Sequence, residues 1–198
     1  LRTSAVLVVS GETGCGKTTQ VPQFLLDDMI ESERGASCYI ICTQPRRISA
    51  VSVAERVADE RGEKIGQSVG YQIRLESKKS ASTRLLFCTT GILLRRLQGD
   101  SKLEGVSHIV VDEIHERSID SDFLLIILKE LMIKRPDIKI VLMSATLAAN
   151  LYQNYFGIVE KPLFVGAKTY ELTEYFLDDL KQAEKDGKIL LTPYLRRN

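Results

Sequence analysis

The chain has 198 residues with 27 Lys or Arg and 26 Asp or Glu, giving a formal net charge of +1. Apolar residues make up 44% and charged residues 27%, which is typical of one compact globular domain. The near-neutral balance excludes nucleic-acid binding through overall charge, so such a partner would have to meet a local basic patch. No apolar run reaches membrane-spanning length and no signal peptide is visible, so we expect no membrane partner.

The four cysteines lack the paired spacing of a zinc site, so no structural metal is predicted. Cys38 and Cys42 lie in one apolar run and Cys88 in another, where cysteine acts as a small buried hydrophobe. This usage favours a reduced intracellular setting, either cytoplasmic or nuclear. The chain opens one short step before an apolar strand, as expected of a piece of something longer.

Short apolar runs alternate with helical patterns along the chain. The predicted strands are 6–9, 38–43, 84–89, 108–113 and 138–144, and the predicted helices are 20–32, 47–62 and 121–136. Several of the runs lack apolar–polar alternation, which is typical of strands covered on both faces. The pattern predicts an α/β fold, with a mostly parallel sheet and helices on both faces.

A glycine-rich loop of the form Gly11-x-x-x-x-Gly16-Lys17-Thr18 follows the first strand and precedes the first helix. Its glycines allow successive backbone N–H groups to point at one anion, as in phosphate-binding loops. Lys17 supplies a charge for the β- and γ-phosphates, and the Thr18 hydroxyl suits Mg²⁺. The alternative is a glycine-rich connecting turn. The predicted nucleotide contacts are Gly11, Glu12, Thr13, Gly14, Cys15, Gly16, Lys17, Thr18 and Thr19.

Two adjacent acids, Asp112 and Glu113, end the strand at 108–113. Ligands in open α/β sheets bind outside the carboxyl ends of the strands, so both acids are expected to face the glycine loop. Asp112 would hold Mg²⁺ through water, and Glu113 would orient and deprotonate the attacking water. The predicted metal-holding residues are therefore Thr18, Asp112 and Glu113, with Lys17 and His115 added to the catalytic set. A solvated strand end is the alternative.

The segment Ser144-Ala145-Thr146 ends the strand at 138–144. Ser144 and Thr146 can bond to the acids or to His115 across neighbouring strand ends, so the segment is a candidate for coupling the nucleotide site to the rest of the domain. The alternatives are a turn or helix cap here and a structural role for His115.

The pattern weakens after Gly157. We expect one domain over 1–157, then an edge element and the start of a linker over 158–198. Within the second part, 162–166 and 172–177 read as a strand or hairpin, and 178–188 as a charged, solvated stretch.

Five motifs stand in order: GETGCGKT (11–18), TQPRR (43–47), CTTGILLRRL (88–97), DEIH (112–115) and SAT (144–146). The set resembles superfamily 2 RNA helicases, and within them the DEAH/RHA group, from about Val6 to Phe156. The resemblance implies a P-loop NTPase fold, the first RecA-like domain of an ATP-dependent RNA helicase. It implies ATP and Mg²⁺ as cofactors, with other nucleotides left open. It also implies hydrolysis coupled to translocation along single-stranded RNA and its unwinding.

The resemblance also implies roles that the residues alone do not. Arg56 matches an arginine that stacks on the nucleotide base, although alone it would read as an exposed helix arginine. The segments that grip the RNA backbone match Pro45, Arg46, Arg47, Thr89, Thr90 and Gly91. Without the family, Arg46 and Arg47 would read as a solvated pair. The sequence does not decide whether Arg95 and Arg96 face phosphate or solvent.

The sequence departs from the family pattern in three places. Ile114 stands where alanine is commoner, Cys15 replaces a frequent serine, and 165–172 lacks the usual Arg and Pro. The second RecA-like domain, which carries an arginine finger, has no counterpart here. It is therefore an expected partner from the same parent chain, and these residues alone should bind nucleotide weakly and hydrolyse it poorly.

Three other functions remain to be weighed. They are a DNA translocase of the same superfamily, a non-catalytic RNA-binding module with a decayed nucleotide site, and a small-molecule kinase. Loss of Lys17, Thr18, Asp112 or Glu113 would have favoured the second, and the kinase does not explain TQPRR or TTG.

Overall fold

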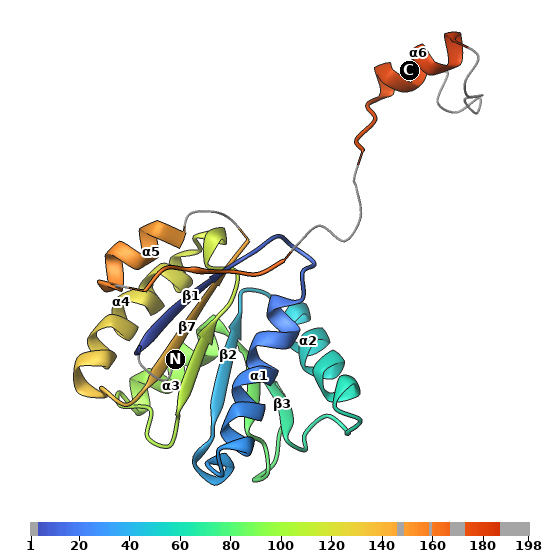
Figure 1. Cartoon of the computed structure of the whole chain (residues 1–198). Helices are drawn as coiled ribbons and strands as arrows, with labels where there is room; N and C mark the ends of the chain where they lie inside the picture. The colour runs from blue at the N-terminus through green and yellow to red at the C-terminus, as the bar shows by residue number, and fades with distance from the viewer. Residues whose placement is uncertain (1–3, 146–148, 159, 167–172, 187–198) are drawn as a thin grey trace. The chain divides into compact units, whose positions relative to one another are not determined.

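A computed structural model of the chain describes residues 4–145, 149–158, 160–166 and 173–186 (Figure 1). The chain divides into two compact units, Leu1–Gly166 and Ala167–Asn198. The first holds the sheet and every motif named above. In the second, the described structure is helix α6, Leu177–Lys185.

One sheet of eight strands organises the first unit. The strands are β1 Val6–Ser10, β2 Ile40–Gln44, β3 Val69–Ile73, β4 Glu76–Lys78, β5 Leu85–Thr89, β6 His108–Val111, β7 Lys139–Ser144 and β8 Leu163–Phe164. Their order is β4-β3-β5-β2-β6-β7-β1-β8. Every neighbouring pair is parallel except the antiparallel pair β3–β4. The predicted mostly parallel sheet is therefore confirmed.

Helices cover both faces of this sheet, as predicted (Figure 1). They are α1 Lys17–Glu31, α2 Arg47–Glu60, α3 Thr90–Gly99, α4 Ile119–Lys134 and α5 Ala149–Phe156, with 3₁₀ turns at Gly35–Ser37 and Ile114–Glu116. Successive side chains of a strand point to opposite faces. Ile40 of β2 accordingly packs in the core under α1 and α2, and Ile41 in the core under α3, α4 and α5. No helix in the described ranges is long and apolar enough to cross a membrane.

Three of the cysteines are buried, as their apolar surroundings predicted. Cys38, Cys42 and Cys88 each have 2% or less of their surface exposed. Burial raises the pKa of Cys88 to about 12, so its thiol stays protonated at neutral pH. These side chains act as small apolar fillers of the core.

The structure differs from the sequence-based expectation in three respects. Helices α3 and α5 were not among the predicted helices. The hairpin β3–β4 was not predicted, because Gly70 and Gln72 interrupt the apolar pattern of β3 and the three residues of β4 are exposed throughout. The strand or hairpin at 172–177 is wrong within the described residues, since 173–176 have no regular structure and α6 begins at Leu177. The acids Asp178 and Asp179 occupy the first turn of α6, where the helix dipole favours them. The domain boundary expected after residue 157 stays a prediction.

Helix α4 offers a test of the core. Leu128 is fully buried, whereas Ile133 on the same helix is 82% exposed. Leu128→Ala should lower the free energy of unfolding by about 2–5 kcal/mol, because it removes buried methyl groups and leaves a cavity. Urea unfolding measures the change. Ile133→Ala is the matched control and should shift stability by about 0.5 kcal/mol or less. Equal losses for the two variants would contradict the assigned core.

Candidate nucleotide site and nucleic-acid rim

The glycine loop connects β1 to α1 and curls through two left-handed residues. Gly14 has φ 84° and Gly16 has φ 87°, a backbone region that costs glycine little. A Cβ added at Gly14 would meet no atom within 4 Å, so the loop is open at this point. At Gly11 an added Cβ would overlap the carbonyl oxygen of Val165, which follows β8. Only glycine fits at Gly11 without moving that strand.

Lys17 begins α1 and folds its side chain back over the loop. Its Nζ donates to the carbonyl oxygens of Gly11 at 2.5 Å and Glu12 at 2.9 Å, and it lies 3.5 Å from Cys15 Sγ. The lysine is 7% exposed. A buried ammonium needs acceptors, and here the loop carbonyls supply them. Lys17, the predicted phosphate-binding residue, therefore lies with its ammonium group at the glycine loop.

The Asp112 carboxyl joins the glycine loop to a neighbouring strand. It is 3% exposed, and Oδ2 accepts hydrogen bonds from Thr18 Oγ1 at 2.6 Å and Gln44 Nε2 at 2.8 Å. Its Oδ1 accepts the backbone N–H of Glu113 at 2.8 Å. The sequence predicted that Thr18 and Asp112 lie at one site, and in the structure their side chains are in contact. The donor set of hydroxyl and carboxyl oxygens fits Mg²⁺, which binds hard oxygen ligands and takes few from protein.

Glu113 lies beside Asp112 in a strained position. Its φ of 54° places a non-glycine residue in the left-handed region, where such conformations cluster at functional sites. Burial, and then the charge of Asp112, raise the pKa of Glu113, while His115 and Lys17 act in the opposite direction. A carboxylate with a raised pKa accepts a proton more readily, as a general base must.

His115 connects Glu113 to the segment that follows β7. Its Nδ1 lies 3.3 Å from Glu113 Oε2 and accepts the N–H of Ala145 at 3.3 Å. The carbonyl of Ser144 accepts the N–H of Gly11 at 3.1 Å. Two of the three predicted coupling residues thus contact the site through their backbones. The third, Thr146, lies outside the described residues.

Arg56 faces the first turns of α1 from α2. Its Nε donates to Glu60 at 2.7 Å, and the same carboxylate accepts the amides of Gln20 and Gln23 at 2.9 and 2.8 Å. These hydrogen bonds, that of Gln23 first, lower the pKa of Glu60. The Arg56 side chain is 67% exposed, so one face of its guanidinium is accessible to an aromatic ring. Its predicted role in base stacking stays a prediction.

A groove of about 510 Å³ at the carboxyl ends of β2 and β5 gathers the predicted RNA contacts. We call it the rim. Its lining includes all six of those residues, Pro45, Arg46, Arg47, Thr89, Thr90 and Gly91. Arg46 pairs with Glu116 at 3.1 Å while 73% exposed, and Arg47 donates to the carbonyl of Arg74 at 3.3 Å. Exposed pairs of this kind are worth about 1 kcal/mol or less, so both guanidinium groups can exchange partners readily.

Comparison with known proteins agrees with this geometry. The DEAD/DEAH box helicase family matches residues 2–154. The chain belongs to that family.

Similar proteins include the DExH-box ATP-dependent RNA helicase DExH1 of Arabidopsis thaliana, 61% identical over 91% of this chain. The putative ATP-dependent RNA helicase DHX57 of Homo sapiens is 54% identical over 99% of it, and the ATP-dependent DNA/RNA helicase DHX36 of Bos taurus is 56% identical over 88%. The chain spans only 18%, 14% and 18% of these relatives, respectively.

Two residues of this helicase domain were missed by sequence reasoning. Gln44 is 2% exposed and bonds to Asp112, and Arg74 lines the rim from the unpredicted β3–β4 hairpin. The position of Gln44 inside TQPRR was a usable signal, because that motif had already been assigned a function. Arg74 lies in the stretch GYQIRLES (70–77), which resembles the family, but no role was assigned to it, and its place at the rim depends on the hairpin.

The raised pKa of Glu113 gives a stability prediction for this helicase domain. A carboxyl whose pKa is higher in the folded than in the unfolded chain disfavours folding once it ionises. Glu113→Gln should therefore increase the free energy of unfolding at neutral pH, and the gain should disappear as pH falls below the ordinary Glu pKa of about 4.3. Urea unfolding between about pH 4 and pH 8 measures it. Glu130→Gln, at an exposed position on α4, should show no such trend. A variant less stable than the original at pH 7 would contradict the assignment.

Proposed function

We propose that this chain is the ATP-binding motor domain of an ATP-dependent RNA helicase, in which hydrolysis drives movement along single-stranded RNA. The main support is a series of hydrogen bonds that joins Thr18 to Asp112 and Asp112 to Gln44. It runs from the glycine loop to β2, whose last residue precedes the rim. A phosphate site and a cationic groove thus share one buried carboxyl. The relatives named ATP-dependent RNA helicases agree with this proposal.

At the nucleotide end, we assign Lys17 to the β- and γ-phosphates and Arg56 to the base. The Lys17 ammonium would exchange its loop carbonyls for phosphate oxygens, which are stronger, charged acceptors. Thr18 and Asp112 would hold Mg²⁺, which supplies neutralisation of phosphate charge when bound. The loop N–H groups and the positive end of α1 would surround the phosphates.

We assign Glu113 as the base that orients the attacking water and accepts its proton. Its raised pKa suits that task. His115 is assigned as the group that positions Glu113, because the ring contacts both the carboxylate and the Ala145 N–H. Movement of the Glu113 side chain would then displace the end of β7, where Ser144 and Ala145 lie. This is the proposed route by which hydrolysis changes the shape of the domain.

At the RNA end, the rim offers guanidinium groups and threonine hydroxyls to phosphates. Contacts of this kind position a strand without reading its sequence. Because the chain spans 14–18% of the relatives above, we propose a second RecA-like domain as the partner that completes the site. An arginine finger from that domain would contribute a factor of about 10³–10⁵ in turnover. An intracellular setting, cytoplasmic or nuclear, stays part of the proposal.

Glu113→Gln tests the catalytic assignment in the full-length protein. ATP binding should be retained, because the phosphate ligands are intact, while RNA-stimulated hydrolysis should fall by at least about 100-fold with loss of the base. Equilibrium binding of a fluorescent ATP analogue and steady-state phosphate release measure the two properties. Glu130→Gln is the matched control and should keep both. Turnover that survives Glu113→Gln would refute the role of Glu113.

Arg47→Ala tests the rim. Affinity for single-stranded RNA should fall to a similar extent across sequences, because only phosphate contacts are lost. Fluorescence anisotropy with oligouridylate, oligoadenylate and the matching DNA strands measures this. A loss confined to one base sequence would contradict the backbone assignment. ATPase stimulation by DNA equal to that by RNA would favour the DNA translocase, a possibility that the DNA/RNA helicase DHX36 makes concrete.

A further inference from the structure

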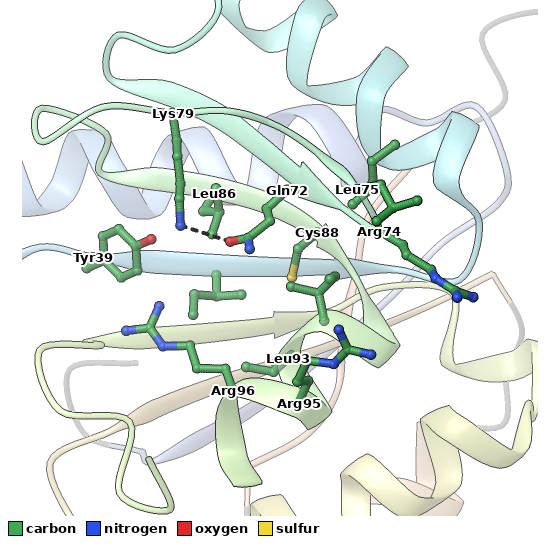
Figure 2. A pocket seen from close by; sticks show the side chains of 13 residues that line it. Tyr39, Gln72, Arg74, Leu75, Lys79, Leu86, Cys88, Leu93, Arg95 and Arg96 are labelled. Atoms are coloured by element: carbon green, nitrogen blue, oxygen red, sulfur yellow. Dashed lines mark hydrogen bonds between the residues drawn. The ribbon is translucent and has the colours of Figure 1, made fainter. Parts of the chain in front are cut away.

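A second and larger groove, of about 800 Å³, lies beside the rim between the β3–β4 hairpin and helix α3 (Figure 2). We call it the α3 groove. Figure 2 shows Lys79 and Gln72 on the hairpin side and Arg95 and Arg96 opposite them on α3. The cations of its lining are Arg74, Lys79, Arg95 and Arg96, and no acidic residue lines it. In a chain of net charge +1, this is a marked local excess of positive charge.

The α3 groove continues the rim. Arg74, Ile92 and Arg95 line both. At its other end, Tyr39 and Arg96 also line a hollow of about 440 Å³ that contains Arg84 and one acid, Glu104. The cationic surface therefore runs from the carboxyl ends of the strands, along α3, toward their amino ends.

The charges along this groove are not neutralised. Lys79 donates to the amide oxygen of Gln72 at 2.9 Å, and the guanidinium of Arg96 lies 5.3 Å from the centre of the Tyr39 ring. Both partners are uncharged. Arg74 and Arg95 form no ion pair within the part of the chain that the structure describes. The rim, by contrast, contains Glu116 and Asp120, so the α3 groove is the more positive of the two.

The floor of the groove distinguishes between possible occupants. Ile41, Leu86 and Leu93 form this floor, and each is 2% exposed or less, whereas Leu75 at the hairpin end of the lining is 98% exposed. An amphipathic peptide needs a continuous apolar floor, and here the three floor side chains offer almost no accessible area while Leu75 is a single exposed side chain at one end. A flexible polyanion needs a track of cations and no apolar floor. The chemistry therefore favours a nucleic-acid backbone.

We infer that the α3 groove holds the continuation of the RNA strand beyond the rim. This inference rests on the proposed function. Leu86 and Cys88 of β5 line the groove, and the five residues of that strand span about 16 Å, which corresponds to roughly five nucleotides at about 3.4 Å each. Lys79 and Arg96 contact the phosphates of this extension, and the rim contacts those that precede it. The extension adds affinity and salt dependence without sequence preference.

The test varies RNA length in the full-length protein. The double variant Lys79→Glu with Arg96→Glu should weaken binding of a 12-nucleotide oligouridylate by at least about tenfold, while a 6-nucleotide strand seated on the rim should bind within about twofold of the original. The slope of log affinity against log salt should fall by about 1.4 for the longer strand, corresponding to two phosphate contacts. Lys79→Arg with Arg96→Lys keeps both charges and should restore binding of the longer strand. Fluorescence anisotropy measures each affinity.

Control variants separate this proposal from the rim. Arg47→Ala should weaken both lengths alike, so the failure of one assignment leaves the other measurable. Lys64→Glu with Lys134→Glu makes the same charge change at exposed positions that line neither groove. This control should not change the ratio of the affinities for the 12-nucleotide and 6-nucleotide strands. The neutral pair Lys79→Gln with Arg96→Gln repeats the test if charge reversal prevents folding.

Three results of the RNA-binding measurements would overturn the inference. They are equal losses for both lengths in the groove variant, no loss for either, and a loss matched by the Lys64 and Lys134 variant. Binding of a polyglutamate peptide that the groove variant abolishes, with binding of the longer RNA unchanged, would also overturn it. That outcome would assign the groove to an acidic protein segment.

Discussion

The buried carboxyl of Asp112 is the constraint on which both ends of the site depend. Three groups from different parts of the chain donate to it: the Thr18 hydroxyl, the Gln44 amide and the Glu113 N–H. Removing a donor from a buried charged group costs about 1–3 kcal/mol or more, so the three positions hold one another in place. The glycine loop, strand β2 and the turn that carries Glu113 are thereby all held by one carboxyl group.

This arrangement explains how a phosphate could be sensed at the rim. Gln44 ends β2, and Pro45 and Arg46 follow it directly. A metal ion that binds Asp112 would compete with the Gln44 amide for its carboxylate oxygen. Gln44 would then shift or lose its acceptor, and the adjoining backbone that carries the rim arginines would move with it. The link is short and buried. Under the proposed function it would connect the phosphate site to the residues proposed to contact the RNA backbone.

Much of this could be predicted from sequence, because strand–helix alternation forces the carboxyl ends of parallel strands to one edge. Thr18, Asp112 and Glu113 were expected together for that reason, and the predicted rim residues line one groove. The hairpin β3–β4 was missed because Gly70 and Gln72 interrupt the apolar pattern of the buried strand β3 and because β4 is short and exposed, and Arg74 was missed with it. Gln44 was missed although it lies inside TQPRR, because the RNA role assigned to that motif was given to Pro45 and the two arginines, and the bond from Gln44 to Asp112 is visible only in the structure.

Gly11 illustrates a separate consequence of how the loop is packed. The space that a side chain would need there is filled by the carbonyl oxygen of Val165, whose N–H donates to Ser10 at 2.7 Å. Intolerance to substitution at this position would thus appear even in a protein that never met a nucleotide. A mutational scan that scores residue 11 as essential reports on the seating of an edge strand as well as on ligand recognition. Gly14 has open space around it, but its φ of 84° strains any other residue, so a substitution there reports on the loop backbone as well.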